Sequence, residues 1–448
     1  MRKAISEIIL VLLAVSTLAL AFNIRQAGCL ELPEIEWSRV WGGPSYDFPY
    51  SMIKTFDGGY AIFGVFANVS FDWWLIKTDS FGNVQWNKTY GGAGDDLGYS
   101  IVETEDGGYM LAGSIDTFEP QWHDAWLVKV DSSGNMQWNK TYGGFGSDHA
   151  HSLVKTSDGK YVMGCWTSSF GADYEYWLVK VDSSGNMQWN KTYGIADKTA
   201  YLEYVIETSD GGYAIFGDIQ YWDGVNILED LWLVKTDSSG NHQWNKTYGG
   251  SNNEWAHSVM EMSDSGYMLA GSTESFGAGD DDCWLVKVDS SGNMEWNKTY
   301  GGISADDPGS MIKTSDGGYA IAGATYSFGE GAGDAWLVKF DSSWNVLWNK
   351  TYGGALEDYA ASIVETDHDE YVFAGMTESF GAGSWDWWLV KVAPPRHPPP
   401  HHPVGGFWTP VDKFSLVAPY MGIASTILIA IAATAICVKR VKHRKEKQ

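Results

Sequence analysis

The stretch Trp138-Asn-Lys-Thr-Tyr-Gly143 decides the fold, because it recurs along the chain at nearly fixed spacing. Copies begin at Trp86, Trp138, Trp189, Trp244, Trp296 and Trp348, 51 to 55 residues apart. Repeats of this length are typical of β-propellers and solenoids, in which each repeat is one supersecondary unit. We therefore expect one repeat architecture rather than a series of unrelated domains.

One unit, read outward from this stretch, contains four short apolar segments at residues 100–104, 109–113, 124–129 and 138–142. The turns Asp106-Gly-Gly108 and Asp131-Ser-Ser-Gly-Asn135 supply Gly and Asn, which accept the positive φ of tight hairpins. A four-stranded sheet that is apolar on both faces must be covered on both sides, and a radial ring of blades does this. The unit therefore predicts one propeller blade.

The number of blades follows from how the ring closes. The seventh unit supplies three strands, at residues 362–366, 371–375 and 388–391, and then runs into prolines. Residues 37–43, before the first unit, match the missing strand position by position. Two open strand edges would invite aggregation. The sequence therefore predicts an all-β fold, a seven-bladed β-propeller over residues 36–392 that is closed by its N-terminal strand.

Both ends of the chain resemble targeting segments. Residues 1–21 predict a secretory signal peptide, with an uncleaved anchor or lipidation at Cys29 as alternatives. Residues 393–413 are proline-rich and predict an extended spacer. Residues 414–438 carry no charge and predict one C-terminal transmembrane helix, followed by a basic tail at 439–448. By the positive-inside rule, we expect a single-pass cell-membrane protein with an extracellular propeller and a cytoplasmic C-terminus.

The composition excludes some functions. The formal charge is -26, and an acidic exterior repels phosphate, so we expect no nucleic-acid partner. Only Cys165 and Cys283 lie within the repeats, in blades that are not neighbours. We therefore expect neither a disulfide framework nor a metal site built on thiolates.

The recurrent pattern DGGY…AG…SFGAG…D.WLVK.DSSGN..WNKTYGG resembles the tandem propeller repeats of prokaryotic, archaeal-type cell-surface proteins. It is also distantly similar to the quinoprotein repeat, with Asp131, Gly134 and Trp138 in the corresponding order. The resemblance covers residues 37–392 and implies the fold. No group of residues corresponds to the quinone and calcium site of quinoproteins, so that cofactor does not carry over.

Two sets of acidic residues recur from unit to unit. In the first set, an acid lies two residues before the third-strand Trp, and a Lys lies three residues after that Trp. Because this acid and this Lys occur in all seven units, they indicate turn bonding or ion pairing between blades. The other lies four residues before the inner strand. It comprises Asp47, Asp96, Asp148, Glu254, Asp306 and Asp358, with Ala200 in the fourth unit. Two interpretations stand: Asp96, Asp148, Glu254, Asp306 and Asp358 hold Ca²⁺ at the channel mouth, or each acid bonds its own loop.

The loops into the first strand and between the second and third strands vary between units, and strand alternation places both sets on one face. Variable loops on a rigid scaffold predict a binding site. Aromatic side chains rimmed by Asp suit a sugar ring or a protein partner. His149, His151 and His257 also have the chemistry of metal ligands or a general base. The candidate ligand-binding residues are Trp122, His123, His149, His151, Tyr221, Trp222, Trp255 and His257, with Tyr174 and Tyr176 nearby.

The sequence also contains seven Asn-x-Ser/Thr sequons, which predict glycosylation of an exported protein. The acceptors are Asn68, Asn87, Asn139, Asn190, Asn245, Asn297 and Asn349. Six of them are copies of one repeat position, so strand packing is the alternative reason for the triplet.

Together these features predict a membrane-anchored binding or adhesion module for glycans or envelope and partner proteins, with Ca²⁺ as the one candidate cofactor. The alternatives are a secreted propeller enzyme, acting as a glycan hydrolase or lyase or a quinoprotein-like oxidoreductase, and an architectural envelope protein. No nucleophile motif or phosphate loop is present in the sequence to favour the enzyme.

Overall fold

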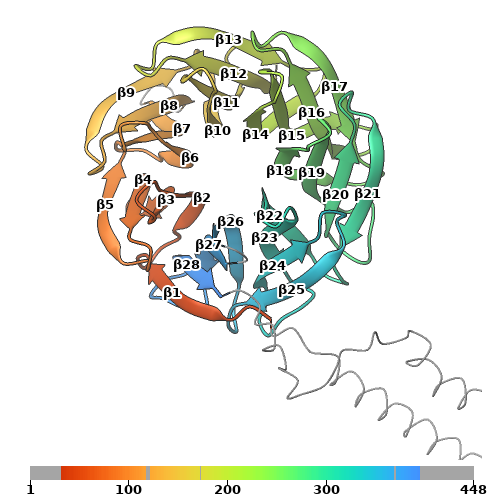
Figure 1. Ribbon diagram of the computed structural model, residues 1–448. Coiled ribbons are helices and arrows are strands. Elements are labelled where there is room, and N and C mark those ends of the chain that lie inside the picture. Colours follow the sequence, from red (N-terminus) through yellow and green to blue (C-terminus); the bar gives the residue numbers. More distant parts are fainter. Residues whose placement is uncertain (1–31, 118–121, 172, 368–369, 394–448) are drawn as a thin grey trace, which may run out of the picture. The chain divides into compact units, whose positions relative to one another are not determined.

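The computed structural model describes residues 32–117, 122–171, 173–367 and 370–393, and these contain 28 strands. The strands form seven antiparallel four-stranded sheets around a common axis (Figure 1). This confirms the predicted all-β, seven-bladed propeller. The expected signal peptide, spacer, transmembrane helix and tail lie outside the described residues, and within the described ranges no helix is long and apolar enough to cross a membrane.

In blades 1 to 6 the chain runs from the innermost strand outward. Blade 1 contains β2 (Phe48–Lys54), β3 (Tyr60–Ala67), β4 (Phe71–Thr78) and β5 (Val84–Tyr90), and blade 2 contains β6 (Leu97–Glu103), β7 (Tyr109–Thr117), β8 (Trp122–Val130) and β9 (Met136–Tyr142). Blade 3 contains β10 (Asp148–Lys155), β11 (Tyr161–Thr167), β12 (Glu175–Val181) and β13 (Met187–Tyr193), and blade 4 contains β14 (Thr199–Glu207), β15 (Tyr213–Trp222), β16 (Ile227–Thr236) and β17 (His242–Tyr248). Blade 5 contains β18 (Glu254–Glu261), β19 (Tyr267–Thr273), β20 (Asp282–Val288) and β21 (Met294–Tyr300), and blade 6 contains β22 (Asp306–Lys313), β23 (Tyr319–Thr325), β24 (Asp334–Phe340) and β25 (Val346–Tyr352). Blade 7 contains β26 (Asp358–Asp367), β27 (Glu370–Thr377), β28 (Asp386–Val392) and, as its outer strand, β1 (Ile35–Trp41).

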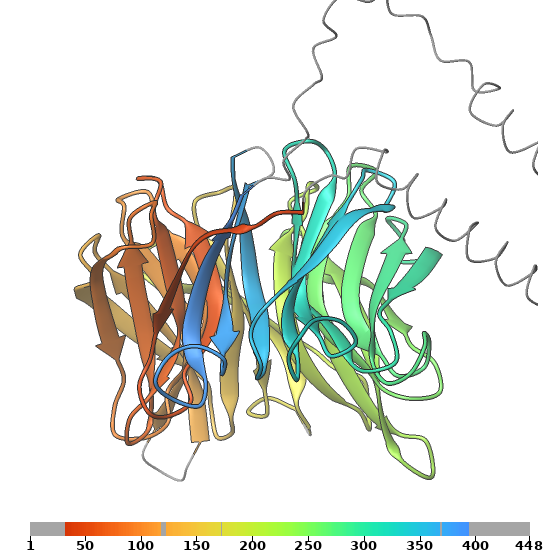
Figure 2. The same cartoon turned by 90° about the horizontal axis from the view of Figure 1, so that it is seen from below.

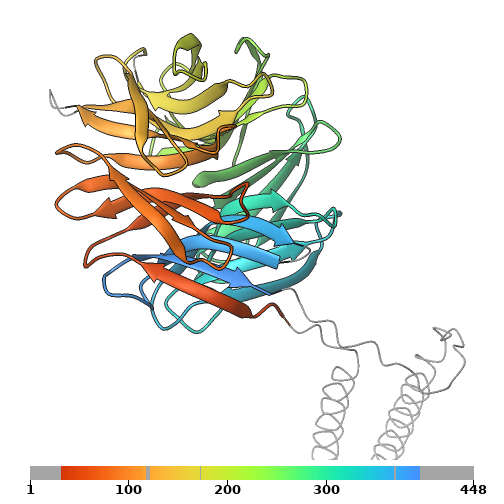
Figure 3. The same cartoon turned by 60° about the vertical axis from the view of Figure 1, so that its left-hand side comes forward.

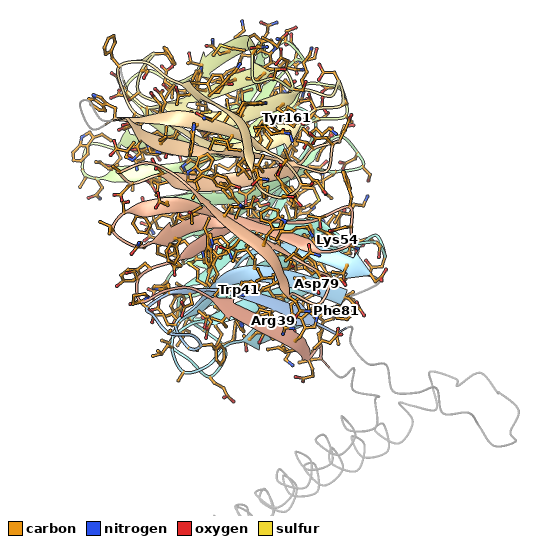
Figure 4. The ribbon with its side chains drawn as sticks, turned by 90° about the vertical axis from the view of Figure 1, so that its left-hand side faces the viewer. Arg39, Trp41, Lys54, Asp79, Phe81 and Tyr161 are labelled. Atoms are coloured by element: carbon orange, nitrogen blue, oxygen red, sulfur yellow. The ribbon has the colours of Figure 1, made fainter. Side chains whose placement is uncertain are left out.

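The N-terminal strand closes the ring, as predicted. β1 pairs antiparallel with β28, from Ile35 opposite Val392 to Trp41 opposite Trp387, and Figure 3 shows the two strands side by side. Arg39 of β1 also reaches blade 1, where its Nη2 donates a hydrogen bond to the Phe81 carbonyl at 2.9 Å (Figure 4). β1 therefore joins the last blade to the first.

The repeated Trp-Asn-Lys-Thr-Tyr stretch connects neighbouring blades. The Tyr90 hydroxyl donates to the Gly134 carbonyl of the next blade at 2.7 Å, and Tyr142 contacts Gly185 in the same way at 2.6 Å. Gly134 has a φ of 76°, and a Cβ there would lie 2.6 Å from the Trp86 ring. Tyr193 with Gly240 and Tyr248 with Gly292 repeat it, so four of the seven seams share this contact.

The hydrophobic core lies in the seams between blades. One cluster combines Met110 and Leu127 of blade 2 with Met163 and Trp177 of blade 3. Cys165 and Cys283 are buried and free, and they lie in different seams. This packing makes each blade depend on its neighbours.

The two faces of the ring differ. We call the face that carries the loops into the inner strands and the second-to-third-strand loops the variable face, and the opposite face the constant face. Figure 2 shows the ring from the side, with the β15–β16 hairpin extending at the variable face. Ile35 pairs with Val392 at the constant ends of β1 and β28, so the chain enters and leaves the propeller at the constant face.

The repeated lysines bond turns within their own blades. Lys77 contacts Asp57 at 2.9 Å, and Lys129 contacts Asp106 at 3.0 Å, each Asp lying in the first turn of the same blade. In blades 5 to 7 the acid that precedes the third-strand Trp bonds its own loop, as when Asp386 Oδ2 accepts from the Ala382 amide at 2.8 Å. Both sets of residues serve the scaffold.

We predict that replacing Asp106 by Asn reduces the sensitivity of the fold to acid. Hydrogen bonds from Thr104 and then Lys129 lower the pKa of Asp106 to about 2, with burial opposing them. Because an unfolded Asp has a pKa near 3.9, the stability linked to this group is present above about pH 4 and is lost as pH falls toward 2. Urea unfolding at neutral and acidic pH should show a smaller acid-induced drop for Asp106→Asn than for wild type; equal drops would contradict the assignment.

Candidate functional site

One position on each inner strand faces the axis and differs between blades. In all seven inner strands the pairing register skips one residue, for example Glu203 between Leu202 and Tyr204. Such a bulge leaves the extra residue outside the ladder. The inner strands surround the axis (Figure 1), and we call the seven bulge residues the axial belt. They are Tyr50, Tyr99, His151, Glu203, His257, Gly309 and Ala361.

Four belt residues form a continuous arc over blades 1 to 4. The Tyr50 and Tyr99 ring centroids are 5.0 Å apart, and Tyr99 stacks on His151 at 4.0 Å. His151 Nδ1 lies 3.2 Å from Glu203 Oε2. Burial, followed by the charge of Glu203, raises the pKa of Tyr50 to about 12, although Tyr50 is 40% exposed. The Glu203 charge therefore acts across the axis on blade 1.

The opposite side of the belt, over blades 5 to 7, has a different composition. His257 Nε2 lies 3.0 Å from Ser272 Oγ, and the Ser272 hydroxyl donates to Asp307 Oδ1 at 2.5 Å. Burial lowers the pKa of His257, with the charges of Asp307 and Glu203 opposing it, so the ring is neutral. Gly309 and Ala361 complete the belt without a polar side chain. The belt is therefore chemically asymmetric, unlike the scaffold that carries it.

An aromatic cluster adjoins the belt at the variable face. Trp166 stacks on His149 with centroids 3.9 Å apart and meets Tyr174 and Tyr201 edge-on at 4.9 and 5.6 Å. His123 of blade 2 lies 4.9 Å from His149. We call these five residues the blade-3 cluster, and His151, 6.0 Å from Trp166, links it to the belt.

Two histidines of this region each have a buried ring nitrogen without a hydrogen-bond partner. His149 is 6% exposed, and burial, with smaller effects from His151 and His123, lowers its pKa to about 2, so its ring is neutral. His149 Nδ1 and His151 Nε2 are buried without a hydrogen-bond partner. Buried polar atoms of this kind are uncommon in native proteins, where a water or ligand usually accounts for them.

The structure brings together only some of the predicted ligand-binding residues. His123, His149 and His151 meet, and His257 lies in the same belt as His151. Tyr221 and Trp222 lie instead on the β15–β16 hairpin, where Tyr221 packs under Lys198 at 4.3 Å and Trp222 is 64% exposed. The remaining two are Trp122, exposed on β8, and Trp255, half-buried on β18.

The acids considered as calcium ligands are buried in separate blades and bond their own loops. Asp148 accepts from the Gly144 amide at 3.1 Å and the Ser169 hydroxyl at 2.6 Å, and its equivalents do likewise. Burial raises the pKa of Asp148, with the hydrogen bonds opposing it. Among the described residues no three His, Cys, Asp or Glu side chains are grouped as a metal would require. This arrangement favours loop bonding over Ca²⁺ binding at Asp96, Asp148, Glu254, Asp306 and Asp358.

Sequence reasoning missed Tyr50, Tyr99 and Glu203 of the belt, and Trp166 and Tyr201 beside it. A signal was available, because a serine follows the belt residue in six of the seven units while the belt residue itself changes from Tyr to His, Glu, Gly or Ala. Comparing units along a strand, rather than along the loops, would have found this position.

The seven sequon asparagines are exposed. At the repeated position the third-strand Trp donates to the Asn side chain, as when Trp126 Nε1 contacts Asn139 Oδ1 at 3.2 Å. This contact gives the triplet a packing role, and glycosylation of these residues stays a prediction.

No family model matches the sequence, and no curated protein does. Solved structures are similar in fold. The WD40 domain of Pan2 from Neurospora crassa has a TM-score of 0.49 and 7% identity, covering 80% of this chain and 97% of its own. The β-propeller domain of the Trilobed protease from Pyrococcus furiosus has a TM-score of 0.43 and 10% identity, covering 83% and 99%. A protein of unknown function from Dyadobacter fermentans has a TM-score of 0.46 and 9% identity, covering 80% and 98%. The chain is a tandem seven-bladed β-propeller, a fold that commonly mediates binding.

Proposed function

We propose that this protein is a membrane-anchored, extracellular binding module that holds a glycan where the blade-3 cluster meets the axial belt. The observation that carries the proposal is the pair of buried, unpartnered nitrogens, His149 Nδ1 and His151 Nε2, beside the Trp166 and Tyr99 rings. A bound ligand would supply the missing hydrogen bonds, which are costly to leave unmade.

The chemistry of the cluster supports a glycan. Its rings are aromatic, and Tyr174, Tyr201 and His123 add polar tips. Such side chains offer an apolar face to a sugar ring and hydrogen bonds to its hydroxyl groups. His149 stays uncharged throughout the physiological range. A protein partner is the other outcome that a binding experiment would reveal.

The position of the chain ends supports anchoring. β28 ends at Val392 on the constant face, and the proline-rich residues 393–413 and the apolar residues 414–438 follow. A propeller tethered there would present its variable face away from the membrane. The resemblance of the repeat to prokaryotic cell-surface proteins is consistent with this placement.

We predict that Tyr174→Ala and His123→Ala each weaken glycan binding about tenfold, because an aromatic contact contributes roughly 0.5–1.5 kcal/mol beyond the area it buries. Binding of the propeller, residues 32–393, would be measured on a glycan array and then by calorimetry with the best glycan.

Trp222→Ala is the matched control, because Trp222 is an exposed aromatic residue of the same face outside the cluster. Unchanged melting temperatures would show that the variants fold. Glycan binding that survives Tyr174→Ala and His123→Ala but is lost with Trp222→Ala would place the site on the hairpin instead, and retention of protein ligands alone would overturn the glycan assignment.

A further inference from the structure

We propose that the axial belt binds a primary ammonium group of the ligand. This inference rests on the proposed function, because it requires the ligand to enter from the variable face. It goes further by naming the charged group that the ligand carries.

Hydrogen-bond chemistry on the blade-4 side is the first argument. The Glu203 carboxylate can only accept, so His151 Nδ1, 3.2 Å away, must be the donor. The other ring nitrogen, His151 Nε2, is buried without a partner, and the Glu203 carboxylate keeps further acceptor positions beside it. A donor from the ligand would satisfy these positions.

The blade-5 side of the belt also offers a hydrogen-bond acceptor. Asp307 accepts from the Ser272 hydroxyl, so the Ser272 oxygen in turn accepts from His257 Nε2. The neutral His257 therefore turns a second acceptor, Nδ1, to its surroundings. The Glu203 carboxylate and His257 Nδ1 thus offer acceptors on the two halves of the belt, and an ammonium group, with three donors and no acceptor, is complementary to them.

Uncompensated negative charge is the second argument. The Glu203 charge is felt at Asp218, which is 9% exposed and accepts from the Ala256 amide at 2.6 Å: burial, then the charge of Glu203, raises the pKa of Asp218 and favours its uncharged form. Among the described residues, no Lys or Arg lies within ion-pair distance of Glu203, Asp218 or Asp307, and the one basic side chain that contacts Glu203 is His151. A buried or half-buried charge favours a cationic partner.

The distribution of lysines leaves the variable face with a negative electrostatic potential. In the described loops of that face Lys198 is the single Lys or Arg, and it lies over the Tyr221 ring. The lysines of the third strands lie at their constant ends, and the others of the repeats lie on outer strands or at the constant ends of inner strands. The face therefore attracts cations and repels anionic polymers.

Aromatic residues complete the site. Tyr50 and Tyr99 present rings beside Glu203, and tyrosine faces attract an ammonium group within about 6 Å. Across the belt, Gly309 and Ala361 carry no polar side chain, and the Tyr359 hydroxyl packs against Gly309. An unacetylated amino sugar and a lysine side chain are the two sources of this group.

The test compares glucosamine oligomers, their fully N-acetylated counterparts and a lysine-containing peptide, by calorimetry with the propeller in mildly acidic buffer. We expect the glucosamine oligomer to bind at least tenfold more tightly than the acetylated oligomer, which has the same rings but no charge. Glu203→Gln should remove this preference, and added salt should weaken it. Asp173→Asn, an exposed acid of the same face, is the matched control and should retain the preference.

A second variant keeps the test informative if Glu203→Gln fails to fold. Ala361→Lys places a tethered ammonium in the belt and should block the glucosamine oligomer. Equal binding of the two oligomers, both sensitive to Tyr174→Ala, would overturn the ammonium inference and leave glycan binding in place. Binding of the lysine peptide alone would support the ammonium site and overturn the glycan assignment, and no binding of any probe would overturn both.

Discussion

A chain that lacks β1 should lose its cooperative thermal transition. Removing residues 32–43 leaves β28 with an open edge, because six residue pairs between β1 and β28 are lost. The Arg39 contact to Phe81 and the ion pair of Lys391 with Glu36, at 3.0 Å, disappear as well. At roughly 0.5–1.5 kcal/mol for each hydrogen bond, the loss is about 5 kcal/mol, comparable to the whole stability of many domains.

The measurement is calorimetric melting of chains that begin at Leu32 and at Pro44, both ending at Ala393. A synthetic peptide covering residues 32–43 should restore the transition when added to the shorter chain, because the edge of β28 stays available for pairing. A shorter chain that melts like the longer one, without peptide, would show that blade 7 is stable with three strands.

We predict that Asp306→Ala destabilises the propeller by about 3 to 5 kcal/mol. Asp306 is fully buried and accepts hydrogen bonds from the Gly302 amide and the Ser327 hydroxyl, both at 2.7 Å, and from the Thr325 hydroxyl. Its removal leaves the buried Thr325 hydroxyl and the half-buried Gly302 amide without a partner, at roughly 1–3 kcal/mol each, whereas the Ser327 hydroxyl keeps the Ser304 carbonyl as acceptor. Urea unfolding measures the effect, with Asp280→Ala, an exposed acid nearby, as the control.

The same variant separates the two interpretations of the acidic ring. If the acids serve their loops, a chelator should leave the melting temperature of the wild-type propeller unchanged. A chelator-induced drop that is absent from Asp306→Ala would instead restore the calcium interpretation.

Closure of the ring was predictable because Trp37 and its neighbours match the outer strand of every other blade residue by residue. The axial belt was missed because the units were compared along their loops and not along their inner strands, where the serine after the belt residue marks the position in six units. The comparison of loops led to Trp222, because differences in loop length are visible in a sequence. The direction of a side chain is not, so the sequence did not show that Trp222 lies outside the cluster. The role of Asp306 depended on Thr325 and Ser327, whose approach only the folded loops reveal.

The attachment of both chain ends at the constant face has a mechanical consequence. If a ligand is held at the variable face while the chain is pulled through Ala393, the force runs nearly parallel to β28. The hydrogen bonds to β1 and β27 are then loaded together in shear, instead of opening one after another like a zipper. Such a strand resists detachment until many bonds fail at once, which suits a head that must hold its ligand against a steady pull.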